Sequence, residues 1–273
     1  MSRTIALLVL LLASTYAAAA ERESLALIDE LRSNECGARV LPRLRSVDTL
    51  ERAAGHVLQG ATLRQALLSA GYRADRSQLV HVALGSDRAA LRPLLAKHCA
   101  ALIDPVLTDG GIFSNERELA IVLAKPFDPP STENRERIAA EVLQLVNEAR
   151  SQARRCGANQ YSAVPPLTFA PELARAAKRH AEDMAHRGYA SHDGSNGSTP
   201  GQRATRAGYP WRSVGENVAG GHLTAREVVD GWLASPGHCA NIMDGDYRQM
   251  AVAFVVNRES PDGIYWAQMF GRR

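Results

Sequence analysis

The amino-acid sequence predicts two α+β domains in tandem, and three features of the chain support this prediction. Short stretches of the first half recur in the second half in the same order. The second half shows helical spacing of apolar residues, followed by two apolar runs around an Asp-Gly turn. A proline-containing stretch, 125–135, separates the halves. We therefore expect a signal peptide at 1–20, a first domain at 21–127, a linker at 128–134 and a second domain at 135–273.

The internal repeat covers most of both halves. The stretch "TLRQALLSAGY" (62–72) matches "TPGQRATRAGY" (199–209), with identical Thr, Gln, Ala, Gly and Tyr. The other matches, in chain order, are 27–33 with 145–151, 77–85 with 213–221, 97–104 with 237–244, and "AKPF" (124–127) with "AQMF" (267–270). A collinear series of this kind predicts two copies of one domain.

The repeat also selects a disulfide pairing. Four cysteines allow three connectivities, and spacing alone does not choose among them. Each copy has one cysteine after its first predicted helix and one in a His-Cys-Ala sequence. We therefore predict Cys36–Cys99 and Cys156–Cys239, and a closed loop of such length stabilises a fold by about 4 kcal/mol in the chain-entropy model.

The first residues and the composition predict an exported, soluble protein. A positive start, the apolar run 5–12 and the alanines at 18–20 are typical of a signal peptide cut after Ala20. The apolar run is shorter than the roughly 20 residues of a transmembrane helix, and we expect no membrane-spanning segment in the mature chain. The formal net charge of +3 does not favour nucleic-acid binding. We expect a secreted or periplasmic location.

Helices and strands of the second half follow from local patterns. We expect a first helix over 135–155, because apolar residues recur there at helical spacing. A second helix begins at Pro171 and ends near Arg187, before Gly188. A third begins after Thr224 in the capping-box sequence "TARE" and ends at "SPG" (235–237). Strands are expected at 251–256 and 264–270, which gives three helices and a small antiparallel sheet.

Four motifs of the second half together resemble the CAP superfamily (cysteine-rich secretory proteins, antigen 5 and pathogenesis-related proteins) in its bacterial form. They are "YASHDGSNGSTPGQRATRAGY", "GENVAGG", "VVDGWLASPGHCANIM" and "YWAQMFG", and the resemblance extends over 135–273. It implies a three-layer α-β-α sandwich. It also implies a central cleft lined by two His and two Glu, which can hold a divalent metal in some members of the family.

The resemblance carries over to individual residues. His192, Glu216 and His238 match three positions of the family's His/Glu set, and Ser235 stands where the second glutamate usually lies. Ser235 and Asn217 are expected to line the same cleft. Two imidazoles and a carboxylate form the ligand set of many open zinc sites, so the matched residues predict weak binding of zinc or another divalent metal. The alternative is a structural role, in which Glu216 hydrogen-bonds the imidazoles. Glu227 is explained by its capping box.

For function, the resemblance implies a non-enzymatic binding protein whose ligand is a lipid, a sterol, a cell-envelope component or another protein. The alternative is a hydrolase that uses water on a metal held by His192, Glu216 and His238. A serine hydrolase is disfavoured because no GxSxG sequence frames Ser191 or Ser235. The first copy lacks the loop that contains His192. Because the repeat places Val80 opposite Glu216, we expect a degenerate domain there, without the site.

Overall fold

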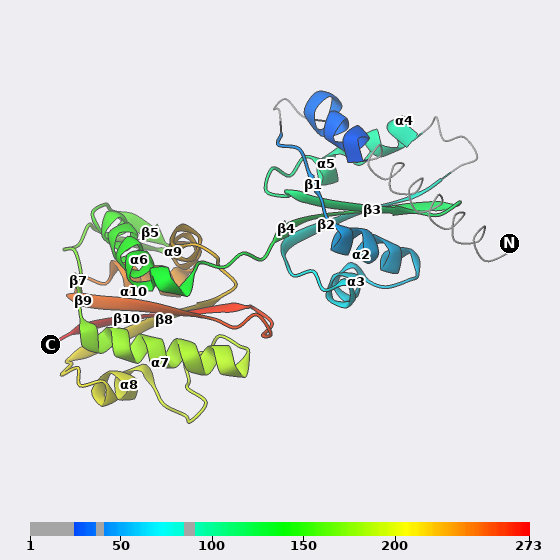
Figure 1. The fold of residues 1–273 in the computed structure, drawn as a ribbon. Helices are drawn as coiled ribbons and strands as arrows, with labels where there is room; N and C mark the ends of the chain where they lie inside the picture. Colours follow the sequence, from blue (N-terminus) through cyan, green and yellow to red (C-terminus); the bar gives the residue numbers. More distant parts are fainter. Residues whose placement is uncertain (1–24, 37–40, 85–90) are drawn as a thin grey trace. The chain divides into compact units, whose positions relative to one another are not determined.

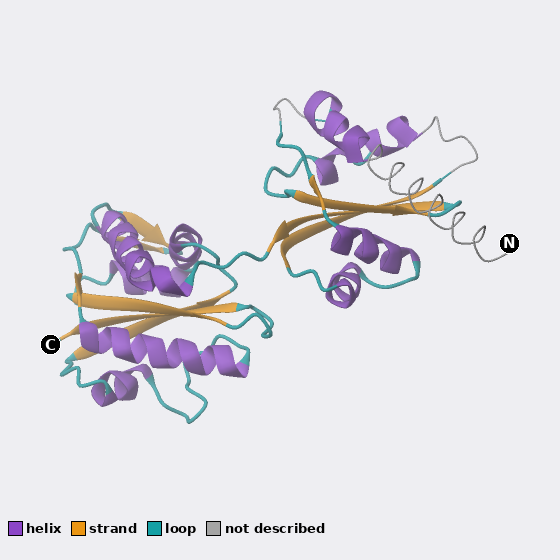
Figure 2. Ribbon diagram, viewed as in Figure 1, coloured by secondary structure: helices purple, strands orange, loops and turns teal. Residues whose placement is uncertain are grey.

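The computed structural model describes residues 25–36, 41–84 and 91–273, and the predicted signal peptide lies outside these residues. The chain divides into two compact units, the first ending at Phe127 and the second beginning at Asp128 (Figure 1). In each unit a sheet lies between two layers of helices (Figure 2). This architecture confirms the predicted α+β class. No helix among the described residues is both long enough and apolar enough to cross a membrane.

The first unit is built around a four-stranded sheet of order β1-β3-β4-β2. Helices α2 and α3 cover one face through Leu50, Ala66 and Val122, while η1, α4 and α5 cover the other through Leu31, Leu95 and Ile121. The elements are η1 (Leu31–Glu35), β1 (Arg45–Ser46), α2 (Asp48–Leu58), α3 (Leu63–Ala70), β2 (Ala74–Ala83), α4 (Leu91–Ala96), α5 (Cys99–Leu102), β3 (Asp109–Ser114) and β4 (Glu118–Pro126).

The second unit has a four-stranded sheet of order β7-β9-β10-β8 and a small β5-β6 hairpin. Helices α7 and α8 lie on one face, and α6, α9 and α10 lie on the other (Figure 1). The elements are η3 (Thr132–Asn134), α6 (Arg135–Arg150), β5 (Arg154–Cys156), β6 (Asn159–Tyr161), β7 (Thr168–Phe169), α7 (Pro171–Arg187), α8 (Pro200–Arg206), β8 (Ser213–Gly220), α9 (Ala225–Ala234), α10 (Pro236–Met243), β9 (Gln249–Val256) and β10 (Ile264–Arg272).

Several local predictions are confirmed. Helix α7 begins at Pro171 and ends at Arg187, and Gly188 follows in the left-handed conformation with φ 78°. Helix α9 begins after Thr224, whose hydroxyl accepts from the Glu227 N–H. The predicted hairpin joins β9 and β10, and both predicted disulfides, Cys36–Cys99 and Cys156–Cys239, are present.

Other local predictions are wrong. Helix α6 ends at Arg150 rather than at 155, because the following residues 154–156 pair with β6. Helices α8 and α10 were not predicted. "SPG" does end α9, but Pro236 then occupies the first turn of α10, a position that suits proline. The sheets are not purely antiparallel, since β1 pairs with β3 and β7 pairs with β9 in parallel.

The two large sheets share their topology and their register. Val47 N–H donates to the Gly110 carbonyl in the first unit, as Ala170 N–H does to Met250 in the second. On the inner strands Ala124 pairs with Asp109, and Gly271 pairs with Gln249. Ala124 therefore takes the place of Gly271 rather than Ala267, so the "AKPF"/"AQMF" match is out of register.

The same register corrects the residue opposite Glu216. Glu216 faces α7 and α8, where it contacts His180 and Arg203, whereas Val80 packs with Leu95 in the opposite layer. Because strand residues alternate between faces, a slip of one residue reverses the side. The match 62–72 with 199–209, continued without a gap, places Leu79 opposite Glu216. Leu79 does pack on the α2–α3 side.

Candidate functional site

A buried carboxylate lies at the centre of the candidate site. Glu216, on the edge strand β8, is 4% exposed. Its Oε2 accepts from Arg203 Nη2 at 2.7 Å, and its Oε1 lies 3.0 Å from His192 Nδ1. His180 Nε2 is 3.7 Å from the same Oε1. An unpaired buried carboxylate would be strongly destabilising, so Arg203 and the two imidazoles are what allow Glu216 to stay inside.

Arg203 joins the loop that carries His192 to the sheet. The guanidinium is 7% exposed. Besides Glu216 it binds two main-chain carbonyls, donating from Nη2 to His192 O at 2.7 Å and from Nη1 to Ser198 O. It lies one turn into α8, which begins with a full capping box between Thr199 and Gln202. The capped helix therefore fixes Arg203, and Arg203 fixes the loop.

His192 is the exposed end of this network. Its side chain is 52% exposed, and Nδ1 faces Glu216. The hydrogen bond to Glu216 raises the pKa of His192, against the opposing effect of partial burial. None of the described residues hydrogen-bonds to its Nε2 atom. The result is an oriented imidazole that presents Nε2 at the surface.

His238 lies beside His192 but in a different electrostatic state. The centroids of the two rings are 6.2 Å apart, with an interplanar angle of 52°. Burial lowers the pKa of His238, and the neighbouring His192 lowers it further. The pKa of His192 is therefore raised while that of His238 is lowered, so of the two rings His192 is the one more readily protonated.

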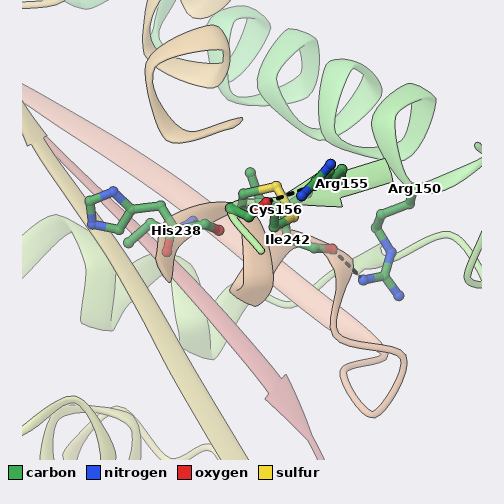
Figure 3. Close-up of a disulfide and its surroundings, with 8 residues drawn as sticks. Arg150, Arg155, Cys156, His238 and Ile242 are labelled. Carbon is green, nitrogen blue, oxygen red and sulfur yellow. Dashed lines mark hydrogen bonds between the residues drawn. A yellow bond between two sulfur atoms is a disulfide. The ribbon is translucent and has the colours of Figure 1, made fainter. Parts of the chain in front are cut away.

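Helix α10, which carries His238, is anchored on its α6 side (Figure 3). Arg150 is fully buried and donates from Nη1 to the carbonyls of Ile242 at 2.6 Å and Asp244 at 2.9 Å. Burial lowers its pKa to about 10. The Cys156–Cys239 disulfide joins β5 to the residue next to His238. Together these contacts fix the position of the His238 backbone.

Asn217 lies in a different place from the one expected, whereas the place of Ser235 in the cleft stays a prediction. Asn217 is fully buried and faces away from Glu216, donating to Gln268 Oε1 at 2.9 Å and to the His238 carbonyl at 3.2 Å. Through the bond to the His238 carbonyl, Asn217 links strand β8 to helix α10. Ser235 is half-buried between α9 and α10, and its side chain caps neither helix. Glu227 accepts from the Leu223 N–H at 2.8 Å, in keeping with a role at the start of α9.

The geometry bears on the predicted metal site of His192, Glu216 and His238, which stays a prediction. Within the described part of the chain, no group of three His, Cys, Asp or Glu is arranged to hold a metal ion. Both oxygens of Glu216 are engaged, one by a guanidinium. The arrangement therefore does not fit a site in which Glu216 is a ligand. It resembles instead the carboxylates that orient a ligating histidine from behind.

Sequence reasoning missed two members of the network, His180 and Arg203. His180 is 1% exposed, and its Nε2 donates to the Ser191 carbonyl at 2.7 Å. Burial is the main cause of its lowered pKa. A signal was present, since His180 shares the buried face of α7 with Ala176, Ala177 and Met184. A histidine at a core position of an amphipathic helix needs polar partners.

Comparison with known proteins gives a family match within the second unit. Residues 143–270 match the family model described as "Cysteine-rich secretory protein family" (CAP). Among curated proteins, the uncharacterized protein YkwD of Bacillus subtilis (strain 168) is 28% identical over 130 residues, covering 48% of this chain and 45% of that protein. The uncharacterized membrane protein YlbC of the same organism is 30% identical over 107 residues, covering 39% of this chain and 29% of YlbC. The chain thus spans less than half of either relative.

Solved structures give weaker likenesses. An outer surface protein from Borrelia burgdorferi has a TM-score of 0.41 at 21% identity, covering 53% of this chain and 96% of that one. An extracellular protein containing an SCP domain from Bacillus anthracis str. Ames has a TM-score of 0.43 at 16% identity, covering 77% and 71%. The family match, the CAP motifs and the two disulfides agree. The C-terminal unit therefore contains a region, residues 143–270, that matches the cysteine-rich secretory protein (CAP) family, and this unit is called the CAP unit below.

Proposed function

We propose that this chain is an exported, non-enzymatic binding protein, and that its CAP domain takes a ligand at His192 and His238. The observation that carries the proposal is the engagement of Glu216. One of its oxygens pairs with Arg203 and the other with His192, an arrangement in which Glu216 orients His192 rather than facing a ligand itself. Glu216 thus orients His192, the residue that we propose binds the ligand, and does not contact the ligand itself.

The state of the two imidazoles supports a ligand with an acceptor oxygen. The raised pKa of His192 favours its protonated form, in which Nε2–H is a charge-assisted donor. His238 is held neutral by burial and offers a second contact without a second charge. A carboxylate, a phosphate or a hydroxyl group of a lipid, a sterol, a cell-envelope component or a protein meets this requirement.

Export is part of the proposal. Residues 1–20 have the composition of a signal peptide, and both disulfides are of the kind that persists in an oxidising compartment. We propose a secreted or periplasmic location on these grounds.

We also propose that the first unit is a degenerate copy of the same domain. Its sheet has the same strand order and register as the CAP sheet. In each unit a disulfide joins a cysteine that follows the first helical element to a cysteine that directly follows a histidine and lies in a short helix. On this proposal, the first unit retains the sheet and the helices on its two faces, called the frame below, and has lost the His192–Glu216–His238 site.

A metal-dependent hydrolase is the second candidate, favoured by the 6.2 Å separation of the His192 and His238 rings. In that case the two imidazoles would supply nitrogen ligands, with Glu216 supporting His192, and the ion would supply an activated water. Ser235, in place of a carboxylate, leaves such a site short of one ligand.

Zinc titration by calorimetry separates the two candidates. The full disulfide-bonded chain is compared with His192→Ala, His238→Ala and Ser235→Glu, each checked for folding, and the same samples are screened for ester and peptide hydrolysis. The binding proposal predicts weak zinc binding or none in the wild type, and tighter binding without turnover in Ser235→Glu. Zinc-dependent turnover in the wild type that disappears in His238→Ala would establish the hydrolase instead.

A further inference from the structure

The CAP sheet has an incompletely paired edge on the side away from the His192 site. The strand order β7-β9-β10-β8 places Glu216 at one edge and β7 at the other. Strand β7 pairs with β9 only at Gln249 and Met250. From Ala251 to Val256, β9 has a strand neighbour on the β10 side alone within the described chain.

The main-chain groups that face outward along this edge follow from the pairing. The Met250 carbonyl accepts from Ala170 N–H on the β7 side. Because outward and inward groups alternate in an antiparallel strand, Val252 and Phe254 also direct their N–H and C=O groups to this edge. An unpaired edge of this kind is a template for another strand.

A largely apolar groove runs along the same edge, between α6 and α7. Its volume is about 620 Å³, within the range of roughly 300–1,000 Å³ that is usual for ligand pockets. The side chain of Phe169 at one end is 55% exposed, an unusual position for a large aromatic residue. The apolar lining includes Ala139, Leu143, Phe169, Ala174, Val252 and Phe254.

The charged side chains that line the groove indicate the charge of the partner that it would bind. Arg135, Arg175 and Lys178 line the groove, against one acidic lining residue, Glu136; Lys178 also pairs with Glu182 on the same helix, so the excess positive charge lies mainly on Arg135 and Arg175. A second copy of the same edge would bring like charges together, which disfavours a symmetric dimer. An occupant with acidic groups is favoured.

In the described part of the first unit, a larger side chain takes the place of one groove residue. By the register of the two sheets, Phe113 stands where the second unit has Ala253. Gly55 of α2 faces the Phe113 ring, since a Cβ added there would lie 3.5 Å from it. Polar residues such as Glu51 and His56 line that region. Among the described residues, the bulk of Phe113 is therefore what the first unit has in place of the small Ala253 of the groove.

We propose that this groove binds an extended peptide segment of a partner protein, which adds to β9 as a strand. Main-chain hydrogen bonds to Val252 and Phe254 would supply affinity. Apolar side chains of the peptide would enter the groove beside Phe169, and acidic residues would pair with Arg135, Arg175 and Lys178. The groove is distinct from the candidate site at His192, and the proposal does not depend on that site.

The test is selection of a displayed heptapeptide library on the full disulfide-bonded chain, followed by affinity measurement of synthetic copies of the enriched peptides. We expect alternating apolar residues flanked by Asp or Glu. Val252→Pro removes one outward N–H while keeping the pairing with β10, and proline is tolerated at such edge positions. It should weaken binding about tenfold.

Two further variants and one control variant keep the proposal testable if Val252→Pro unfolds. Ala253→Phe, which introduces the bulk found in the first unit, should abolish binding. Lys178→Glu should weaken binding about fivefold, and Arg187→Glu, at an exposed position of the same helix outside the groove, should not. Bound peptide should also slow amide hydrogen exchange at Val252 and Phe254.

The proposal is overturned if no peptide is enriched over an unrelated control protein, or if enriched peptides bind wild type and Ala253→Phe equally. It is also overturned if sedimentation shows a dimer that Val252→Pro abolishes, since the occupant of the edge would then be a second copy.

Discussion

In each unit a buried arginine near the end of the first helical element binds the carbonyl groups that follow a short later helix. Arg150 donates to the carbonyls of Asp244 and Tyr247. Arg32 donates to those of Asp104 and Leu107, which hold the same places relative to the second cysteine. Both arginines are at most 1% exposed. The same kind of contact is therefore present in both units.

A second polar contact is also shared. Tyr209 donates to Gln249 Oε1 at 3.0 Å, and Tyr72 donates to Asp109 Oδ2 at 2.8 Å. In both cases the tyrosine follows the helix with the Thr–Gln capping box, and its partner is the first residue of an inner strand. The frame of the two units therefore includes specific buried polar pairs as well as apolar packing.

The interiors differ where the candidate site lies. By the shared register, Glu216, Arg203 and His180 of the CAP unit correspond to Leu79, Ala66 and Val57 of the first unit, all of which pack in one apolar cluster. A buried ion pair is costly to break but inexpensive to replace as a whole by apolar residues. The comparison indicates that the polar network of Glu216, Arg203 and His180 can be replaced as a whole by apolar residues while the sheet and its helices remain.

The largest predicted effect is the loss of one member of that network. Arg203→Ala leaves Glu216 buried without its cation, which should lower the free energy of unfolding of the CAP unit by about 3–5 kcal/mol. The three tryptophans lie in this unit, so urea unfolding followed by tryptophan fluorescence reports on it.

The matched control for Arg203→Ala is the triple variant Glu216→Leu, Arg203→Ala, His180→Val, which copies the first unit. It should recover most of the lost stability. A triple variant less stable than Arg203→Ala would show that the network is not replaceable as a unit.

The next effect concerns the shared arginines. Arg150→Met leaves the carbonyls around Ile242 and Asp244 without their donor, and should destabilise the CAP unit by about 3 kcal/mol. Arg32→Met should have a similar effect on the first unit, seen as faster amide hydrogen exchange in β4, with little change in the tryptophan transition. Equal changes of both signals in both variants would contradict the division into two units.

A smaller difference is expected between the two tyrosines. Tyr72→Phe removes a hydrogen bond to the buried carboxylate of Asp109 and should cost about 1.5–3 kcal/mol, whereas Tyr209→Phe loses a bond to a neutral amide and should cost about 1 kcal/mol. Hydrogen exchange in β3 and in β9 measures each. The opposite order would mean that Arg45, which also binds Asp109, satisfies that carboxylate alone.

The frame was largely predictable from sequence because its signals are local or are repeated. The collinear repeat selected both disulfides, and Gly188 and Thr224 marked helix ends through backbone preferences. The short helices α8 and α10 were missed because each has only about two turns, too few for a periodic pattern to be recognised. The short pairing of β7 depends on tertiary contact and has no sequence pattern of its own.

The candidate site was predictable only in part. Family resemblance identified His192, Glu216 and His238, but residue types alone did not reveal that Arg203 neutralises Glu216. The face of β2 was misassigned because one gap in an alignment reverses every side chain of a strand. Asn217 was placed in the cleft for the same kind of reason, since it neighbours Glu216 in sequence but points to the other side of the sheet.

The most direct test of the account is a titration of His192 and His238 by NMR in the full chain, beside Glu216→Gln. We predict that the pKa of His192 lies above the ordinary histidine value of about 6.5 and that of His238 below it. The raised pKa means that His192 contributes stability that is complete below its unfolded-state pKa and is lost as pH rises through its folded-state pKa. In Glu216→Gln the pKa of His192 should fall to or below the ordinary value. If His192 titrates at or below the ordinary value in the wild type, or is unchanged in Glu216→Gln, then Glu216 does not orient it, and the proposed binding site is wrong.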